Sequence, residues 1–503
     1  MAEIRMSESD SQLNLAARES AGVGTRVASS VALLWSTNML MRGMQLATTA
    51  ILARLLTPGD YGLIAIAATV AGFIDLMSNL QTGGALMRLK ELTGEHLGSA
   101  FSVNMIRGLL TSLALVLLAQ PLADYMGDAR LAGVLYALAP SALMNSLHNP
   151  YFLLFARNID YRREAKRNAL AAIGGSMAGI AVALAVPSYW ALVAGSLCTS
   201  AIALGLSYWR VPGMPRPTLK KSAEFLSYGS WLILINLMEY ANSKVDYLLI
   251  GKGLGNRPLG AYHLGQQVTV MATGDIVAPM SQALMPAFSI LSGDPERLRA
   301  AYRRLQSLTL ALALPVGFGV SALAEPIVFL LVGRQWEQAI PVIHFLAPII
   351  ALQTVIASIE SLALATHNGR LLVIRTFIYL CVRTGLMFAG FYMGGYPGII
   401  YARMLSGSFF LIYGLTLAAH ITGSRWFDPL AASWRSFASV AVMWCVLYAL
   451  PAEDTLVALG SRILLGGALY IGTHLLLWKL SGLPEGAESK LLELARQAWK
   501  RVL

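Results

Sequence analysis

The sequence predicts an all-α integral membrane protein, and two observations carry this prediction. Fourteen apolar stretches can be marked along the chain, and most approach the length of about 20 residues that a helix needs to cross a bilayer core. The Lys and Arg residues between these stretches fall almost entirely into alternate loops. Because cytoplasmic loops of membrane proteins hold the excess of Lys and Arg, this alternation also predicts an orientation.

The predicted orientation places both termini in the cytoplasm. In that orientation, with residues near the ends of spans counted in the adjoining loops, 26 of the 38 Lys and Arg residues lie in tails and inner loops, 6 lie in outer loops and 6 lie inside spans. Charged residues make up only 13% of the chain, against about 25% in soluble domains. The net charge of +11 sits in short clusters beside the spans, where anionic lipid attracts it, so nucleic acid is not expected as a partner.

The predicted spans are separated by very short outer loops, such as residues 187–188 and 392–397, and by longer basic inner loops. The spans are expected at 26–55, 60–82, 98–120, 131–156, 167–186, 188–209, 226–251, 258–288, 305–332, 338–366, 370–392, 397–420, 434–451 and 459–480.

An internal duplication is predicted from two similar segments, each at the joint between an odd-numbered span and the next. Residues 53–62 and 251–260 align at an offset of 198 positions, with a basic residue, a Leu and a Gly coincident. Six spans followed by six spans in the same orientation is the form of a repeat-built transporter. We therefore expect two pseudo-symmetric six-helix bundles plus two additional C-terminal helices.

This organisation divides the chain into six expected segments. They are a polar cytoplasmic tail (1–24), an N-terminal six-helix lobe (25–210), a cytoplasmic linker (211–225), a C-terminal six-helix lobe (226–421), two additional transmembrane helices (422–482) and an amphipathic cytoplasmic tail (483–503).

Charged residues inside the predicted spans are the candidate functional residues. An unpartnered Arg or Lys at mid-bilayer costs roughly 2.5–3.5 kcal/mol, so these side chains are expected to face protein or water. For Asp246 and Arg403, near the outer ends of their spans, a structural role is favoured, because their side chains are expected to extend toward the interface. The cations are Arg42, Arg107, Lys244, Arg375, Arg383 and Arg403, and the acidic residues are Asp75, Glu239, Asp246, Asp275, Glu325 and Glu360.

Two interpretations of these charges stay open. Equal numbers of cations and acids are consistent with structural ion pairs that hold helices together. Polar stripes on the first span of each half instead favour one cationic cavity between two lobes. Its substrate-binding cations would be Arg42, Lys244, Arg383, Arg375 and Arg107, and its polar wall would be Asn38, Gln45, Asn145, Asn149, Asn236 and Tyr240. No metal site or cofactor is expected, because the His and Cys residues show no ligand spacing.

Three segments carry a resemblance to a known family. Residues 51–63 resemble the signature that joins the first two helices of Wzx-type polysaccharide flippases, closest to the branch of colanic acid and succinoglycan exporters. Residues 246–251 with 259–262 are similar to the helix 7–8 joint of that branch, and residues 156–162 to its inner loop after helix 4. The resemblance runs through roughly residues 25–425 and places the chain in the superfamily of multidrug, oligosaccharidyl-lipid and polysaccharide transporters.

The resemblance implies two bundles of six helices around a central cavity that opens alternately to either side. The implied cargo is an undecaprenyl-diphosphate-linked oligosaccharide, moved across the bacterial inner membrane for exopolysaccharide, capsule or O-antigen assembly. Arg suits the diphosphate because its planar fork donates several hydrogen bonds at once. Implied partners are the lipid-linked oligosaccharide, membrane lipids and possible neighbours such as a polysaccharide polymerase and a chain-length regulator. For coupling to a cation gradient, the candidate carboxylates are Asp75, Glu239 and Asp275.

Two other function classes are alternatives to a flippase. A multidrug extruder of the same superfamily remains the main alternative, although cationic drugs favour acidic cavities and the intramembrane arginines argue against it. A membrane glycan polymerase or ligase is less favoured, because such enzymes carry a large outer loop with reactive residues. The longest outer loop here, residues 121–130, is short and contains no catalytic constellation, so no enzyme activity is expected.

Overall fold

The computed structural model describes residues 41–482, except 79–81, 90, 158, 159, 161 and 452–454. Among these, side chains are not described at 88, 156, 225–235, 274–283, 285 and 286. The predicted terminal segments 1–24 and 483–503, and the candidate wall residue Asn38, lie outside the described residues.

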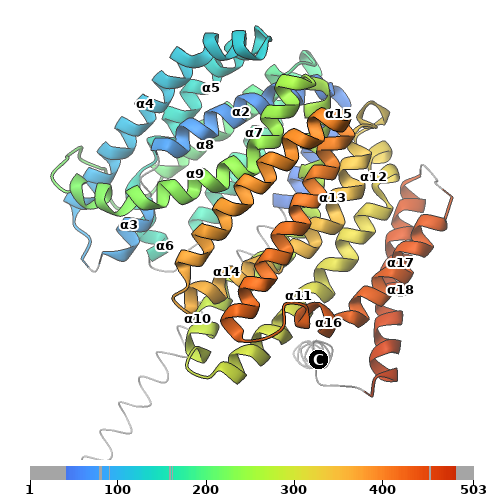
Figure 1. Cartoon of the computed structure of the whole chain (residues 1–503). Helices are drawn as coiled ribbons and strands as arrows, with labels where there is room; N and C mark the ends of the chain where they lie inside the picture. The colour runs from blue at the N-terminus through green and yellow to red at the C-terminus, as the bar shows by residue number, and fades with distance from the viewer. Residues whose placement is uncertain are drawn as a thin grey trace, which may run out of the picture. The chain divides into compact units, whose positions relative to one another are not determined.

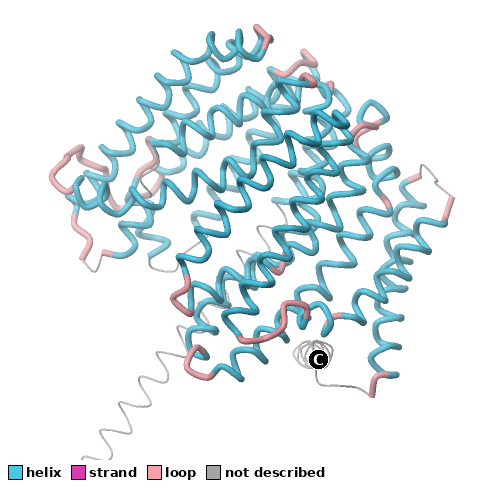
Figure 2. The backbone as a smooth tube through the Cα atoms, viewed as in Figure 1, coloured by secondary structure: helices cyan, strands magenta, loops and turns pink. Residues whose placement is uncertain are grey.

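All regular structure in the described residues is helical, which confirms the predicted fold class (Figures 1 and 2). Residues 41–55 form the first described helix. The following helices are α2 (Pro58–Ser78), α3 (Thr82–Arg88), α4 (Gly94–Met126), α5 (Arg130–Ser146), η1 (Pro150–Phe152), α6 (Leu153–Arg157), α7 (Arg162–Ala185), α8 (Trp190–Ser207) and α9 (Ser222–Gly253). The remaining helices are α10 (Asn256–Leu291), α11 (Pro295–Ala322), α12 (Ala324–Leu331), η2 (Arg334–Trp336), α13 (Ala339–Gln353), α14 (Ile356–Ala365), α15 (Gly369–Thr422), α16 (Asp428–Ala432), α17 (Trp434–Ala449) and α18 (Leu456–Leu480).

The predicted spans overlap these helices throughout the described residues, but three of them are divided. The span 131–156 comprises α5, η1 and α6, the span 305–332 comprises parts of α11 and α12, and the span 338–366 comprises α13 and α14. Within those residues, 8 helical segments are both long and apolar enough to cross a membrane. One of them, α15, has 54 residues, enough for the two spans expected at 370–392 and 397–420. The chain is therefore a multi-span membrane protein, and the number of fourteen spans stays a prediction.

The helices form two compact units. The N-terminal unit contains the described residues up to Leu55 together with Val70–Ile233, and the C-terminal unit contains Leu56–Thr69 and the described residues from Leu234 onward. The division falls inside α2 and α9, so each of these helices contributes to both units. The additional helices α17 and α18 belong to the C-terminal unit.

In the N-terminal unit, α4 packs against α5, α7 packs against α8, and α5 also contacts α8 (Figure 1). The segment that leads to α9 is attached to α4 by side chains that bond its backbone. Ser102 Oγ accepts the Thr218 N–H at 3.0 Å, and Ser99 Oγ accepts the Lys221 N–H at 3.1 Å. The predicted linker is thus an ordered part of this unit.

In the C-terminal unit, α11 and α15 pack on either side of α13, and α14 packs on α10 and α15. Leu310, Leu314 and Ile359 are fully buried in the centre of this core. The additional pair α17–α18 joins the same core because α17 packs on α11, and Tyr470 Oη of α18 donates to the Ala311 carbonyl at 2.7 Å.

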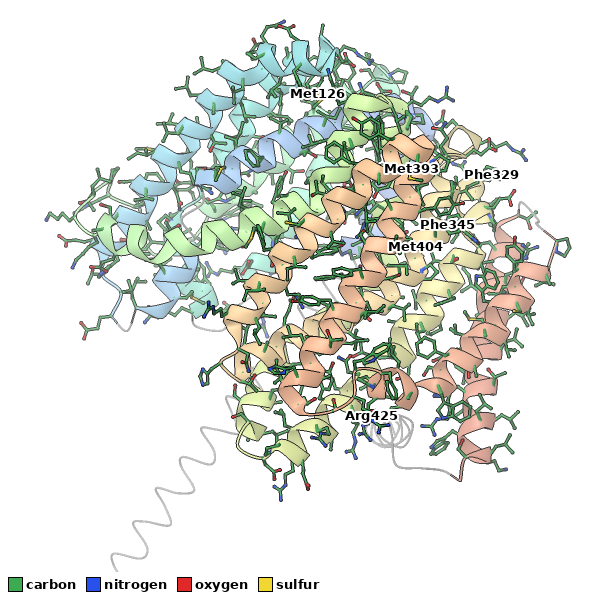
Figure 3. The ribbon with its side chains drawn as sticks, viewed as in Figure 1. Met126, Phe329, Phe345, Met393, Met404 and Arg425 are labelled. Carbon is green, nitrogen blue, oxygen red and sulfur yellow. The ribbon has the colours of Figure 1, made fainter. Side chains whose placement is uncertain are left out.

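Helix α15 contains a sharp turn, and the chain is helical on both sides of it. Gly395 has φ 56° and ψ −129°, a conformation that favours glycine, and Pro397 follows as a residue suited to the first turn of a helix. Met393, just before the turn, is 89% exposed (Figure 3). A tight turn is therefore present where a short loop was predicted at 392–397, and its place on the outer side stays a prediction.

The two segments that suggest an internal duplication, 53–62 and 251–260, pack against each other through reciprocal contacts. A Cβ added at Gly62 would overlap the carbonyl of Asn256, and one added at Gly260 would overlap the carbonyl of Pro58. Gly62 and Gly260 are 198 positions apart, and so are Pro58 and Asn256. Each helix start therefore contacts its counterpart in the same way, as two repeats related by an approximate two-fold axis would.

The start of α2 is also stabilised locally. Thr57 precedes the helix and Asp60 is its third residue, and the two bond reciprocally: Asp60 Oδ2 accepts from Thr57 N–H at 3.0 Å, and Thr57 Oγ1 accepts from Asp60 N–H at 3.3 Å. This exchange satisfies backbone donors that a helix start leaves without partners. The motif at residues 57–62 thus combines a helix cap with a glycine contact surface.

Candidate functional site: buried charge networks

The most deeply buried ion pair of the described residues joins Asp246 on α9 to Arg383 on α15. Arg383 Nη2 donates to Asp246 Oδ2 at 2.9 Å, and their side chains are 3% and 0% exposed. Tyr262 of α10 donates its hydroxyl to the same carboxylate oxygen at 2.5 Å. A buried carboxylate is tolerable only when paired and hydrogen-bonded, and Asp246 meets both conditions.

Tyr379 extends this pair into a chain of contacts on α15. Its hydroxyl oxygen accepts from Arg383 Nη1 at 3.2 Å and from Arg403 Nη1 at 3.4 Å. Its ring stacks on Phe410 with centroids 4.1 Å apart. One aromatic side chain therefore holds two guanidinium groups from the two halves of α15.

A second ion pair joins α14 to α15. Arg375 Nη2 donates to Glu360 Oε1 at 2.7 Å, and its guanidinium lies 4.7 Å from the centroid of the Phe410 ring. The arginine side chain is 3% exposed, but the glutamate side chain is 43% exposed. Glu239 of α9 is close enough to interact electrostatically with both members. Arg375 Nε and Nη1 have no hydrogen-bond partner among the described residues.

Lys244 completes the group on α9. Its ammonium lies 4.3 Å from the centroid of the Tyr247 ring, a cation–π contact. The Tyr247 hydroxyl is 3.0 Å from His263 Nδ1 on α10. We call these groups the C-terminal network. Its described charged side chains are the cations Lys244, Arg375, Arg383 and Arg403 and the carboxylates Glu239, Asp246 and Glu360.

The expectation that Asp246 and Arg403 extend toward the interface is wrong. Asp246 is 0% exposed and Arg403 is 8% exposed. Depth along a span was the basis of that expectation, but the face of the helix decides the outcome. Asp246 faces Tyr262 and Arg383, and Arg403 faces Tyr379, so both charges are held by protein partners.

A smaller network lies in the N-terminal unit, and we call it the N-terminal network. Arg107 of α4 lies 3.4 Å from Asp75 of α2, and its Nη2 donates to Ser146 Oγ of α5 at 3.3 Å. One turn along, the hydroxyls of Ser78 and Thr111 are 3.1 Å apart. The Asp75 side chain is 45% exposed and that of Arg107 is 14% exposed. This pair is looser and more accessible than the pair in the C-terminal unit.

The remaining predicted wall residues are spread over both units. Arg42, Gln45 and Asn145 have exposed side chains. Tyr240 donates its hydroxyl to the Thr69 carbonyl at 2.6 Å. Asn236 is partly exposed, and the side chain of Asp275, a candidate for ion coupling, lies outside the described side chains.

Asn149 occupies a position that its sequence context did not reveal. It is 2% exposed, its side-chain oxygen accepts the Tyr151 N–H at 3.0 Å to cap η1, and its amide donates to the Gly213 carbonyl at 3.0 Å. All of these partners belong to the protein itself, so the side chain ties the segment after α8 to the end of α5.

Sequence analysis missed Tyr262 and Tyr379, which organise the C-terminal network. A signal for Tyr379 does exist, because Arg375, Tyr379 and Arg383 are spaced four residues apart and share one helix face. Tyr262 has no comparable local signal, since its partner Asp246 is on another helix. Within the described residues no group of three or more His, Cys, Asp or Glu side chains could hold a metal ion.

Apolar spanning helices that carry ionisable side chains on protein-facing surfaces define a polytopic membrane protein of the kind that provides a path for polar cargo. The chain belongs to the polysaccharide biosynthesis protein family, whose model matches residues 51–341, more than half of the chain.

Two relatives span different shares of the chain. It is 23% identical over 451 residues to the lipopolysaccharide biosynthesis protein WzxC of Escherichia coli (strain K12), covering 86% of this chain and 88% of that one. It is 25% identical over 307 residues to the succinoglycan biosynthesis transport protein ExoT of Rhizobium meliloti (strain 1021), covering 61% of this chain and 62% of that one.

Two solved structures share the fold. The lipid II flippase MurJ in an inward closed conformation superimposes with a TM-score of 0.71 at 15% identity, covering 89% of this chain and 99% of the other. A multidrug resistance MATE family transporter in an inward-facing conformation gives a TM-score of 0.61 at 15% identity, covering 75% of this chain and 94% of the other.

Proposed function

We propose that this protein is a flippase that moves an undecaprenyl-diphosphate-linked oligosaccharide from the inner to the outer leaflet of the bacterial inner membrane. It works by alternating access and catalyses no covalent step. The family itself supports the proposal, as do the names of two relatives, one a lipopolysaccharide biosynthesis protein and one a succinoglycan transport protein. The fold shared with a lipid II flippase is the fold this activity needs.

The observation that carries the proposal is the state of Arg375. Only one of its nitrogens bonds Glu360, while two guanidinium donors lack partners among the described residues. A phosphate oxygen is the natural partner for a guanidinium fork. Glu360 is the exposed member of the pair, so its rotation away would open the buried guanidinium to an anionic headgroup.

Exchange of ion-pair partners would couple cargo to an ion gradient. When a diphosphate binds Arg375, Glu360 and the nearby Glu239 are released from the positive charge that neutralises them. Carboxylates so released gain affinity for a proton or a cation. Asp75, paired with Arg107, would make the same exchange in the N-terminal unit, and Asp275 remains a candidate on α10.

The remaining cations Arg42, Arg107 and Lys244 would contact the headgroup at other points of the cycle, while Arg383 would stay bound to Asp246. Asn38, Gln45, Asn145, Asn236 and Tyr240 would form the polar wall for its sugars, while Asn149 keeps its bonds to Tyr151 and Gly213. The orientation we propose has both termini in the cytoplasm, because it places the excess of Lys and Arg inside. A polymerase and a chain-length regulator are the proteins that would act on the delivered repeat units.

The test is complementation of a host strain that lacks the gene for this protein. Surface polysaccharide and lipid-linked repeat units are measured with the wild type, Arg375→Gln and Arg375→Lys. Charged hydrogen bonds contribute about 1.5–3 kcal/mol each, so Arg375→Gln should lower polysaccharide output at least about tenfold and leave repeat units on the inner leaflet. Arg375→Lys keeps the charge but loses the fork, so it should recover part of the output.

The matched control is Arg297→Gln, which removes an arginine that also pairs with a carboxylate, Asp294, but whose side chain is 79% exposed. This variant should complement fully. Wild-type polysaccharide output from Arg375→Gln, at equal protein in the membrane fraction, would refute the role of Arg375.

A multidrug extruder is the second candidate, favoured by the TM-score of 0.61 to a transporter of that kind. The same deletion strain separates the two. Unchanged polysaccharide together with increased sensitivity to cationic drugs would favour the extruder and reject the flippase.

A further inference from the structure

A second concentration of positive charge lies in the N-terminal unit, outside both networks. It lines an open pocket of about 430 Å³ formed where α7 begins and α8 ends. Both helices are long and apolar enough to cross a membrane. Because α7 starts beside the end of α8, the pocket lies at one membrane surface. Its lining residues are Phe152, Arg163, Lys166, Arg167, Leu170, Leu206, Trp209 and Arg210.

Four cations and no carboxylate line this pocket. Arg163, Lys166 and Arg167 are three and four residues apart on α7 and therefore share one face. Arg210, just beyond α8, supplies the fourth charge. Within the described part of the chain none of these four side chains forms an ion pair. Glu164 interacts electrostatically with Arg167 but does not line the pocket. Like charges held together without counter-charge favour an anionic ligand.

Aromatic side chains hold two of the guanidinium groups in place. The Arg163 guanidinium lies 4.2 Å from the centroid of the Phe155 ring, and that of Arg167 lies 4.6 Å from the centroid of the Phe152 ring. Arg163 Nη1 also donates to the Arg210 carbonyl at 2.6 Å. Arg167 Nε and Nη2 donate to Asn168 Oδ1 at 3.2 Å and 3.1 Å. Each guanidinium group still keeps further N–H donors for a ligand.

The apolar part of the pocket faces outward. Leu170 is 50% exposed and Trp209 is 62% exposed. Trp is favoured at membrane–water interfaces, where one part of the ring is in lipid and another meets water. A ligand with a phosphate for the cations and a hydrocarbon chain for Leu170 and Trp209 would match both halves. A water-soluble phosphate would leave the apolar half unused.

We propose that this pocket is a binding site for the phosphate headgroup of an anionic phospholipid of the surrounding leaflet. Basic pockets between transmembrane helices bind such headgroups, and polybasic segments gain about 1 kcal/mol for each Lys or Arg at an anionic surface. The site does not depend on the proposed cargo. It would anchor the N-terminal unit to one leaflet through a lipid that is not transported.

The experiment uses the full chain in nanodiscs of phosphatidylcholine, titrated with phosphatidylglycerol and followed by native mass spectrometry. The test variant is Lys166→Gln with Arg210→Asn, because neither side chain makes a hydrogen bond in the described structure and Asn tolerates the positive φ of 52° at position 210. Loss of two charges should weaken phosphatidylglycerol binding roughly 30-fold. The control Arg297→Gln with Arg304→Gln also removes two charges and should change binding less than about threefold. Equal binding by both variants would overturn the site.

A photoreactive phosphatidylglycerol gives a second test on the wild-type chain, which does not rely on a variant folding. Crosslinks should map to peptides covering residues 152–170 or 206–210, and crosslinks confined to other segments would overturn the proposal. Undecaprenyl diphosphate added as a competitor separates the two lipid phosphates. Phosphatidylglycerol should stay bound, and its displacement from this pocket at equimolar competitor would assign the site to the cargo and overturn the phospholipid proposal.

Discussion

The two units of this protein each place an acid and an arginine inside the membrane helices, but in different surroundings. In the C-terminal unit, Asp246 and Arg383 are 2.9 Å apart with side chains that are 0% and 3% exposed. In the N-terminal unit, Asp75 and Arg107 are 3.4 Å apart and 45% and 14% exposed. The first pair is enclosed and braced by tyrosines, and the second has room to separate. The difference suggests that one pair holds helices together while the other is able to change partners.

The two halves of the chain correspond in their glycine contacts but not in their intramembrane charges. At the joint, Gly62 and Gly260 repeat the same contact at an offset of 198 positions. At that offset from Asp246 and Arg107, the chain has Thr48 and Leu305. The correspondence at this offset is thus found where backbones approach closely, while the intramembrane charges do not follow it. The enclosed pair Asp246–Arg383 therefore serves as an anchor, while pairs with an exposed carboxylate, such as Asp75–Arg107, are able to exchange partners.

The largest effect is expected from Asp246→Asn, which leaves Arg383 buried without its carboxylate. Removing one member of a buried ion pair costs about 3–5 kcal/mol because the remaining charge stays desolvated. The midpoint of thermal unfolding of the purified protein in detergent should fall accordingly. The double variant Asp246→Asn with Arg383→Gln removes both charges and should recover most of the loss. A single variant as stable as the wild type would contradict the structural role of this pair.

A smaller loss of stability is expected from Gly260→Ala or Gly62→Ala at the two-fold joint. The added methyl group would overlap the carbonyl of Pro58 or Asn256, and inserting a group into a well-packed contact costs about 1–3 kcal/mol. The two variants should be similarly destabilised, because the contacts are equivalent. Gly59→Ala is the matched control, since its new Cβ would meet only Thr57 Oγ1 at 3.7 Å. Full stability of either joint variant in the same thermal assay would argue against a close two-fold contact.

The positions of the helices could be predicted from the sequence, but the pairing of the buried charges could not, and the reason is physical. Lipid requires long apolar runs and turns only at their ends, so helix positions follow from composition, and the turn at Gly395 lies where a short loop was expected. Pairing of charges is not local. Asp246 and Arg383 are 137 residues apart, and nothing in either segment specifies the other. Only Tyr379 could have been predicted from the sequence, because it is four residues from both Arg375 and Arg383 and shares their helix face.

The smallest stability effect, and the most informative one, is expected from Asp75→Asn. A pair with this much exposure contributes about 0–1 kcal/mol, so unfolding should shift little. Arg107 keeps its bond to Ser146 and is not left without a partner. If Asp75 exchanges partners during transport, the variant should be stable yet export less polysaccharide, and its residual export should no longer respond to an ionophore that collapses the cation gradient. Asp124→Asn, an exposed carboxylate near the end of α4, should behave as the wild type in both assays. A variant of Asp75 that loses as much stability as Asp246→Asn would instead make the two pairs equivalent, and the distinction between an anchoring pair and an exchanging pair would fail.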